Sequence, residues 1–216
     1  MTDAPASSRV EVRRAPERGV YRRSEIAGIL DEGFVCHLGF VVDGAPVVLP
    51  TMYARVGERL YVHGAPASRM LRGLRAGIDV CLTVTHLDGL VYARSAFHHS
   101  MNYRSVVVMG RAVEVTDTEE KLLALRALVE RFGSGRWDEA RKPSLKEFNK
   151  TLVLAVPLDE ASAKVRGGPP VDDDEDHQLE VWAGVVPLTL SAGEAEPDPL
   201  LPPRIGPPAY VTGKGI

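Results

Sequence analysis

The stretch FVCHLGFVVDGAPVVLPTMYARVGERLYVHG, residues 34–64, decides the fold because it joins three apolar, β-rich runs through two short turn signals. Asp43-Gly44 between two such runs is a strong hairpin signal. Val56-Gly57-Glu58 marks a second turn before the run RLYVHG. We therefore predict an antiparallel meander of three strands at residues 34–42, 46–54 and 59–63.

The apolar runs after the meander predict more strands than helices. Two separate strands are expected in IDVCLTVTHLDG and LVYARSA, and a long strand at residues 103–114. TLVLAVPL, ASAKVRGG and VWAGVVPLTL are predicted as further strands, and Pro187 restricts the last to an edge or a strand end. Six to eight strands with few helices favour a mainly β (α+β) fold, a closed or nearly closed antiparallel barrel, over a doubly wound nucleotide fold.

Helix signals are fewer but carry clear ends. SEIAGILDEG is predicted to be capped by Ser24 and ended by Gly33. APASRMLRGLRAG is predicted as a second helix that stops at Gly77. TEEKLLALRALVERF follows a capping box of Asp117 and Glu120. One face of this third helix is expected to consist of Leu122, Leu125, Leu128, Val129 and Phe132. SLKEFN is expected to form a further short helix.

Composition divides the 216 residues into an arm, one domain and a tail. Residues 1–20 lack periodicity, residues 21–190 hold the predicted elements, and residues 191–216 hold six prolines in an expected extended tail. A net charge of −3 with dispersed basic residues argues against a nucleic-acid or membrane partner. With no secretory signal or long apolar span, and with Cys36 and Cys81 in apolar runs, we expect a reduced cytoplasmic protein with buried thiols. A disulfide between two neighbouring strands stays open as an alternative.

Metal and nucleophile motifs are weak in this sequence. His98 and His99 are adjacent and would point to opposite faces of a strand, and neither CxxC nor HxxxH accompanies them, so no metal site is predicted. No serine lies in GxSxG, and the acidic run DDDED, residues 172–176, is expected to be a solvated loop.

Phosphate binding has better support. HGAPASRML places Ser68 and Arg69 at the start of a predicted helix, where free N–H groups and the positive end of the helix dipole stabilise an anion. Arg104 begins a long apolar strand, where an unpaired inward charge would be costly. The alternatives are that Ser68 only caps the helix, Arg69 is solvated, and Arg104 reaches solvent or pairs with an acid.

RLYVHGAPASRMLRGL and SAFHHSMNYRSVVVMGRA, together with VWAGVVPL, resemble the pyridoxamine-5′-phosphate-oxidase-like family of FMN-binding split barrels. The resemblance covers about residues 20–190 and is closest to the branch that includes the nitroimidazole-resistance flavoproteins. It implies a six-stranded split β-barrel and a homodimer with FMN at the subunit interface.

The resemblance also implies a set of cofactor-binding residues. The backbone of Val47 to Thr51 would line the flavin ring, and His63 is the best match for the reactive histidine of the nitroimidazole branch. Met70 stands where the oxidases have a phosphate-binding lysine. The implied cofactor residues are Val48, Leu49, Pro50, Thr51, His63, Gly64, Ser68, Arg69, Met70, Tyr103, Arg104, Ser105 and Trp182.

The predicted function is therefore an FMN-dependent oxidoreductase acting on a small molecule, with nitro-compound reduction as one form. His63 is the predicted catalytic residue, and His98 or His99 could donate a proton or shape the substrate pocket. PLTLSAGEAEPDPLLPPR has no counterpart of the arginine- and histidine-rich segment that binds substrate in the oxidases, which argues against pyridoxamine phosphate. The alternatives are a flavin or haem carrier without turnover, for which the adjacent histidines keep haem open, and a dimeric module with an empty pocket.

Overall fold

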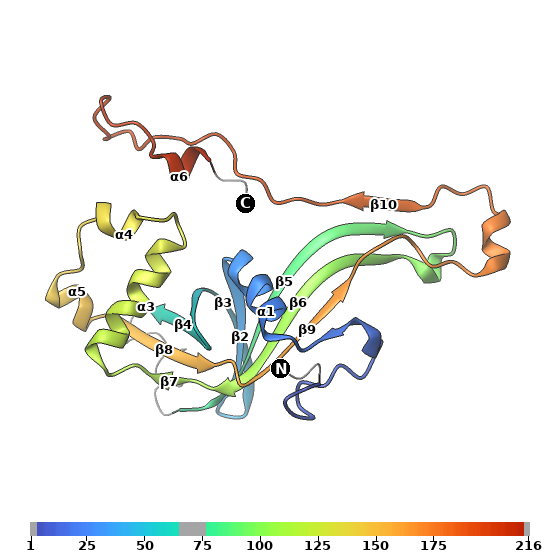
Figure 1. The fold of residues 1–216 in the computed structure, drawn as a ribbon, viewed down its shortest axis with the longest axis horizontal. Coiled ribbons are helices and arrows are strands. Elements are labelled where there is room, and N and C mark those ends of the chain that lie inside the picture. The colour runs from blue at the N-terminus through green and yellow to red at the C-terminus, as the bar shows by residue number, and fades with distance from the viewer. Residues whose placement is uncertain (1–3, 65–76, 214–216) are drawn as a thin grey trace.

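Antiparallel strands dominate the computed structural model, which describes residues 4–64 and 77–213 (Figure 1). The strands are β1 (Gly19–Val20), β2 (Val35–Val42), β3 (Ala45–Val56), β4 (Arg59–Gly64), β5 (Asp79–Tyr92), β6 (Ser100–Arg111), β7 (Val113–Glu114), β8 (Leu152–Pro157), β9 (Glu160–Arg166) and β10 (Gly184–Pro187). The helices are α1 (Arg23–Glu32), α3 (Thr118–Glu130), α4 (Arg136–Glu139), α5 (Leu145–Asn149) and α6 (Ala209–Thr212), with 3-10 turns η1 (Pro16–Arg18), η2 (Ala96–His98) and η3 (Asp174–Gln178). The predicted mainly β class is confirmed.

The meander of β2, β3 and β4 forms as predicted, with tight turns at both connections. Val42 pairs with Ala45 across Asp43-Gly44, whose φ angles are 50° and 77°. Both angles lie in the left-handed region that a two-residue type I′ hairpin turn requires. Gly57, with φ 57°, begins the second turn, between Val56 and Arg59.

The sheet curls back toward its first strand. Its order is β1-β9-β6-β5-β2-β3-β4-β8-β7, and β7 continues β6 after Ala112. If β6 and β7 are counted as one interrupted strand, the circuit β6-β5-β2-β3-β4-β8 has six strands, as expected of a split barrel. With β7 counted separately, β1, β9 and β10 bring the same sheet to ten strands.

Apolar side chains on alternate strand positions fill the interior. Leu38, Leu82 and Val108 are buried on β2, β5 and β6, and Ile26 and Leu30 of α1 pack against the same cluster. The hydroxyl of buried Tyr53 donates a hydrogen bond to the Leu30 carbonyl oxygen at 2.5 Å, which ties β3 to α1. This bond and the apolar contacts fix the helix against the barrel.

Two predicted boundaries and one predicted exposure were wrong. The turn expected after HLDG does not form, because β5 runs through it with only a register shift between Leu87 and Gly89. α1 begins at Arg23 after an N-cap at Arg22, so Ser24 lies inside the helix. The acidic run is not wholly solvated, because the Asp172 side chain is 1% exposed and bonded to Arg94. The helix predicted over APASRMLRGLRAG lies almost wholly outside the described residues.

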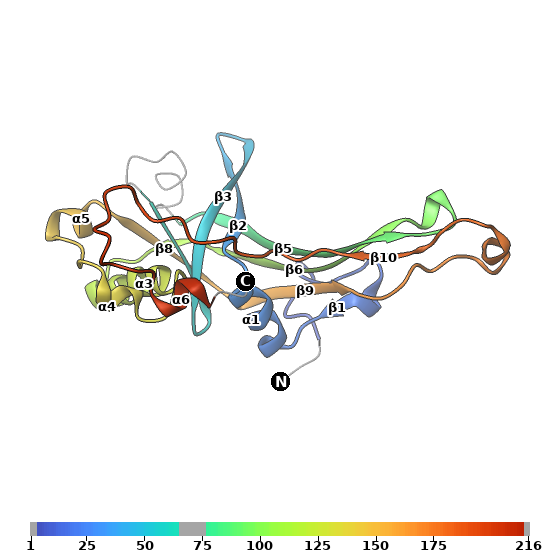
Figure 2. The same ribbon diagram turned by 90° about the horizontal axis from the view of Figure 1, so that it is seen from above.

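The first and last segments are held by contacts with the sheet. β1 pairs with β9, and Val10 is buried, so the predicted arm is ordered over these residues. β10 pairs only with β5 among the described strands, and Pro187 ends it, as predicted for an edge strand. Figures 1 and 2 show β5, β6 and β10 projecting from the barrel as a long arm and the tail returning toward α3 and α4.

The thiols are reduced and no spanning helix is present among the described residues. Cys36 and Cys81 are both free; Cys36 is buried as predicted, whereas Cys81 is only half-buried, and burial raises the pKa of Cys36 to about 12. None of the helices in residues 4–64 and 77–213 is long and apolar enough to cross a membrane. The cytoplasmic location stays a prediction.

Helix α3 buries a narrower face than its sequence predicts. Asp117 caps it by accepting a hydrogen bond from the Glu120 N–H, and Ala124 and Leu128 are buried. Leu122 and Phe132 are instead 45% and 54% exposed, although both were expected on the buried face.

The substitution Leu128→Ala is expected to lower the free energy of unfolding by about 2–5 kcal/mol, since it leaves a cavity where a side chain 3% exposed had packed. Leu122→Ala is the matched control and is expected to cost less than about 1 kcal/mol. Chemical denaturation of both variants measures this. Equal losses would mean that α3 packs as the sequence pattern suggested and not as described.

Candidate functional site

The barrel opens between β3 and β4, where the sequence places the predicted ring-binding strand. β3 pairs with β2 along residues 45–52 but with β4 only along residues 53–56. Within the described part of the chain, the second edge of residues 45–52 therefore has no paired strand. A strand edge carries free N–H and C=O groups that can hydrogen-bond to a planar polar ligand. Val48, Leu49, Pro50 and Thr51 all lie on this open stretch.

His63 lies at the opposite side of the split, near the end of β4. It pairs with Val153 of β8, beyond the point where β4 has separated from β3. Its Nδ1 is buried and has no hydrogen-bond partner in the described structure. Burial lowers the pKa of His63, so the ring is neutral at pH 7. A buried ring nitrogen without a partner, on the strand that borders the split, is a group that a bound polar cofactor could satisfy.

The predicted phosphate segment follows His63 directly. Gly64 ends β4, and Ser68, Arg69 and Met70 lie outside the described residues. Their proposed contacts with a phosphate therefore stay predictions.

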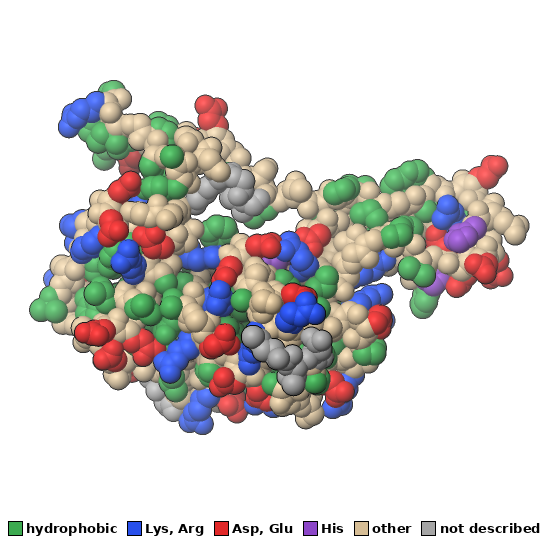
Figure 3. All heavy atoms as spheres, in the orientation of Figure 1, with side chains coloured by type: hydrophobic (Ala, Val, Ile, Leu, Met, Phe, Trp, Pro, Cys, Tyr) green, Lys and Arg blue, Asp and Glu red, His purple; other side chains and the backbone are tan. Residues whose placement is uncertain are grey.

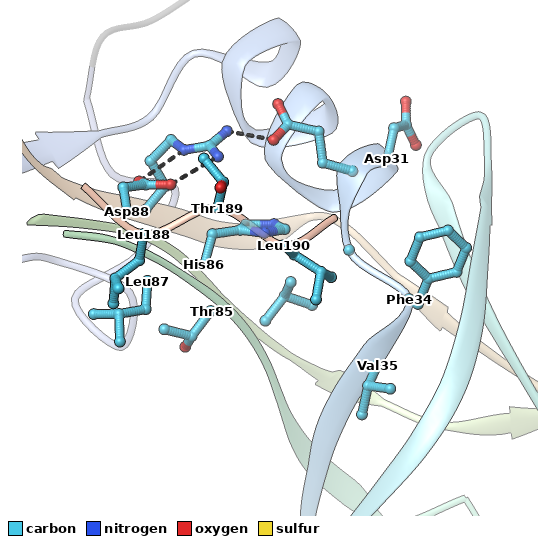
Figure 4. A pocket seen from close by; sticks show the side chains of 14 residues that line it. Asp31, Phe34, Val35, Thr85, His86, Leu87, Asp88, Leu188, Thr189 and Leu190 are labelled. Atoms are coloured by element: carbon cyan, nitrogen blue, oxygen red, sulfur yellow. Dashed lines mark hydrogen bonds and ion pairs between the residues drawn. The ribbon is translucent and has the colours of Figure 1, made fainter. Parts of the chain in front are cut away.

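Arg104 lies in a cavity of mixed polar and apolar lining between α1, β5 and the tail (Figure 4). Its Nε and Nη2 donate to the two carboxylate oxygens of Asp88 at 3.0 Å each, and its Nη1 donates to Glu32 at 2.5 Å. These carboxylates, Asp88 first, raise the pKa of Arg104. The cation is thus already neutralised, and a phosphate would have to displace a bidentate carboxylate pair. The alternatives to phosphate binding were that Arg104 reaches solvent or pairs with an acid, and in the structure it pairs with acids.

The Arg104 cavity has a volume of about 760 Å³ and is lined by residues of α1, β5 and the tail, among others. α1 contributes Asp31 and Glu32, β5 contributes His86, and the tail contributes Leu188 and Leu190. The tail is fixed there by β10 and by the Leu188 N–H, which donates to the Asp88 carbonyl oxygen at 3.0 Å. His86 is held through a 2.9 Å hydrogen bond between its Nε2 and the Ile29 carbonyl oxygen.

The two sequence neighbours of Arg104 lie on the opposite face of β6, so they cannot contact the same ligand as Arg104. Successive strand residues face opposite sides of a sheet, so Tyr103 and Ser105 share one face and Arg104 has the other. The Ser105 hydroxyl donates to the Lys164 carbonyl oxygen at 3.3 Å. The predicted residues therefore divide among the split, the Arg104 cavity and, for Trp182, the projecting arm.

Trp182 lies just before β10, where it contacts Tyr92 with ring centroids 5.6 Å apart. Tyr92 in turn contacts His99 with centroids 5.9 Å apart and an interplanar angle of 73°. Trp182 and His99 were both candidate residues in the sequence, but no local pattern showed that Tyr92 lies between them. Asp88 and Glu32 were likewise not predicted as partners of Arg104, because no local pattern joins residues so far apart in the chain.

These features define the chain as a split-barrel protein with an open strand edge at the split. The comparison with family models makes the assignment specific: residues 22–165 match the model of the pyridoxamine 5′-phosphate oxidase family. The chain belongs to this family, as the sequence resemblance implied. The comparison with curated proteins gave no match.

Solved structures add closer relatives. The flavocytochrome Anf3 from Azotobacter vinelandii is 39% identical over 97% of each chain, with a TM-score of 0.91. The FAD- and haem-binding protein from Mycobacterium smegmatis is 37% identical over 91% of this chain and 96% of its own, with a TM-score of 0.86. A candidate 5-nitroimidazole antibiotic resistance protein from Bacteroides thetaiotaomicron is 23% identical over 68% of this chain and 86% of its own, with a TM-score of 0.58, and shares the fold.

The neutral state of His63 predicts a pH dependence of stability. Its pKa is lower in the folded chain than in the unfolded chain, so the unfolded chain binds more protons near pH 6 and stability falls as pH falls below about 6.5. His63→Gln keeps a polar side chain but cannot titrate. We expect unfolding at pH 7.5 and pH 5.5 to show a smaller loss for His63→Gln than for the parent. His37→Gln, at an exposed histidine of β2, is the control and should lose as much as the parent. Equal losses in the parent and His63→Gln would show that the ring is not held neutral.

Proposed function

We propose that this protein is a flavin-dependent oxidoreductase whose flavin ring lies along the open edge of β3, opposite His63. The observation that carries the proposal is the combination of that unpaired edge with the unpartnered Nδ1 of His63. Membership in the pyridoxamine 5′-phosphate oxidase family supports it. The flavin, when bound, supplies the electron transfer, and the protein supplies binding, orientation and proton positions.

The roles of the residues at the split follow from their chemistry. The backbone of residues 47–51 would hydrogen-bond to the polar edge of the ring, although Pro50 has no N–H to donate. His63, neutral and half-buried, can hold or accept a proton at Nδ1 next to the ring. Ser68 and Arg69, which follow in sequence, would bind the phosphate.

The identity of the flavin is part of the proposal. FMN and FAD share the ring and the first phosphate, which are the parts the split would bind. The family resemblance favours FMN, whereas the name of the relative from Mycobacterium smegmatis favours FAD. We propose FAD, because that relative aligns with nearly the whole chain at 37% identity. Chromatography and mass measurement of the flavin released by heat distinguish the two, and release of FMN alone would return the assignment to FMN.

Haem is a second proposed cofactor, and it makes the protein a flavocytochrome. The names of the two relatives at 39% and 37% identity support this, one being a flavocytochrome and the other an FAD- and haem-binding protein. The exposed histidine and aromatic side chains of the arm are a site of suitable chemistry. A Soret band in the purified protein is the expected observation.

Turnover separates an enzyme from a carrier. The expected result is that NADPH reduces the bound flavin and that a nitro compound reoxidises it. A flavin that no nicotinamide nucleotide reduces would favour the carrier. Protein that takes up neither flavin nor haem after incubation would favour a structural module.

Arg69→Ala is expected to weaken flavin binding about 10- to 100-fold, since a charge-assisted hydrogen bond to phosphate contributes about 1.5–3 kcal/mol. Arg104→Ala is the matched control. We expect it to weaken binding less than Arg69→Ala, because Asp88 and Glu32 already occupy its donors. Fluorescence titration of apoprotein with flavin measures both. Equal losses of flavin affinity in the two variants would mean that Arg104 also binds the phosphate.

A homodimer is proposed from the apolar side chains on the outer face of the barrel. Val35, Val41, Val48 and Leu87 are between 43% and 63% exposed and lie on β2, β3 and β5, whose paired registers place them on one sheet. Exposed aliphatic residues gathered on one face mark an interaction surface. The projecting arm and tail would lie against the second copy.

Val48→Asp is expected to convert a dimer into a monomer, because the new carboxylate would be desolvated at the interface. Val113→Asp is the matched control, since Val113 is 46% exposed on β7, away from this face. Light scattering coupled to size-exclusion chromatography measures the mass. A parent that is monomeric at micromolar concentration would refute the proposed dimer.

A further inference from the structure

The tip of the arm displays apolar and imidazole side chains that the barrel does not use. Figure 3 shows histidine and acidic side chains gathered at the far end of the arm, next to hydrophobic ones. Phe97 is 88% exposed, Trp182 66% and Met101 49%. Large exposed apolar side chains around a histidine are suited to a flat, apolar, metal-containing ligand.

The tip is a fixed structure although it projects. Asp172, whose side chain is 1% exposed, accepts hydrogen bonds from the Arg94 N–H at 2.9 Å and the Ser95 N–H at 3.4 Å. The Arg94 guanidinium pairs with the second oxygen of Asp172 at 2.9 Å. At the base of the arm, buried Arg166 donates to Asn102 and to the Pro169 carbonyl oxygen. The loop before His99 is therefore anchored at both ends.

His99 has the arrangement expected of a metal ligand. Its Nδ1 lies 3.0 Å from the Ser95 carbonyl oxygen. A carbonyl oxygen only accepts hydrogen bonds, so Nδ1 carries the proton and the lone pair is on Nε2. A hydrogen bond from one ring nitrogen to a carbonyl, which fixes the tautomer and the ring orientation, is the usual support of a histidine that binds metal through the other nitrogen.

His98 differs from its neighbour in this respect. Its Nε2 lies 3.1 Å from an Asp173 carboxylate oxygen, and Asp176 adds a second carboxylate to the same small cluster. Its ring also contacts Phe97 with centroids 5.3 Å apart. Nε2 of His98 is thus paired with an acid, whereas Nε2 of His99 has no hydrogen-bond partner among the described residues.

We propose that His99 is an axial ligand of haem iron through Nε2, and that Tyr92 and Trp182 contribute the apolar surface beside it. The inference rests on the proposed haem function and adds its ligand. The edge-to-face contact of Tyr92 with His99 restricts rotation of the imidazole, and Trp182 supports Tyr92 from its other side.

The test compares two adjacent histidines in the full-length protein. His99→Gln removes the lone pair but keeps an N–H that can reach the Ser95 carbonyl oxygen. His98→Gln is the matched control. We expect His99→Gln to reduce bound haem, measured as the pyridine haemochrome per protein after haemin addition and gel filtration, at least ~10-fold. His98→Gln should retain haem within about twofold, and both variants should keep the flavin content and thermal melting of the parent.

Rescue provides a second readout. In His99→Gly, 10–50 mM imidazole (about the range needed for a weak ligand) should restore the Soret band, whereas it should have no such effect in His98→Gly. Haem retained unchanged in His99→Gln would overturn the ligand assignment while leaving haem binding in place. A parent without a Soret band after haemin addition would overturn the haem function together with its ligand, and its flavin content would report the flavin proposal separately.

Discussion

The separation of β4 from β3 beyond Tyr53 is the constraint on which the rest of the architecture depends. β3 is twelve residues long. Its residues 45–52 pair with β2, and only its last four residues pair with β4. Tyr53 lies at the point of separation, buried, with its hydroxyl bonded to α1. β4 pairs with β8 along all of residues 59–64 but with β3 only at residues 59–62, so the first part of β3 keeps an unpaired edge and His63 lies just past the last β3–β4 pair.

Charge is arranged differently at the three places where sequence patterns suggested function. At the split, His63 is neutral because burial lowers its pKa, and a neutral side chain suits an uncharged ring. The Arg104 cavity contains a cation already balanced by two carboxylates. The tip of the arm combines a half-buried Arg94–Asp172 ion pair with exposed aromatic rings. The proposed flavin site, the Arg104 ion-pair network and the proposed haem ligand therefore lie in three different electrostatic environments of the chain.

Local signals in the sequence were sufficient for the turns and caps. Asp43-Gly44 and Asp117 act through their own backbone neighbours, so their roles could be predicted without any tertiary contact. Asp88-Gly89 carries a similar signal, but the turn predicted there was wrong. Pairing with β6 on one side and β10 on the other holds that segment extended.

The site depends on partners that no local pattern reveals. The acids that pair with Arg104 come from α1 and β5, 72 and 16 positions away, and Asp172 finds Arg94 78 positions away. The exposure of Leu122 also depends on residues far away in the sequence. Helical spacing shows that α3 has an apolar face, but it does not show how much of that face the barrel covers. His63 and residues 48–51 were found through family resemblance, and only the strand pairing explains why they face a gap.

Amide hydrogen exchange of the apoprotein, with and without added flavin, tests the central claim most directly. The account predicts that flavin slows exchange in residues 47–52, whose second edge has no paired strand, and leaves residues 37–39 nearly unchanged because this part of β2 is already paired with both β3 and β5. Protection confined to residues 84–88 and 104, around the Arg104 cavity, with none along β3, would contradict it.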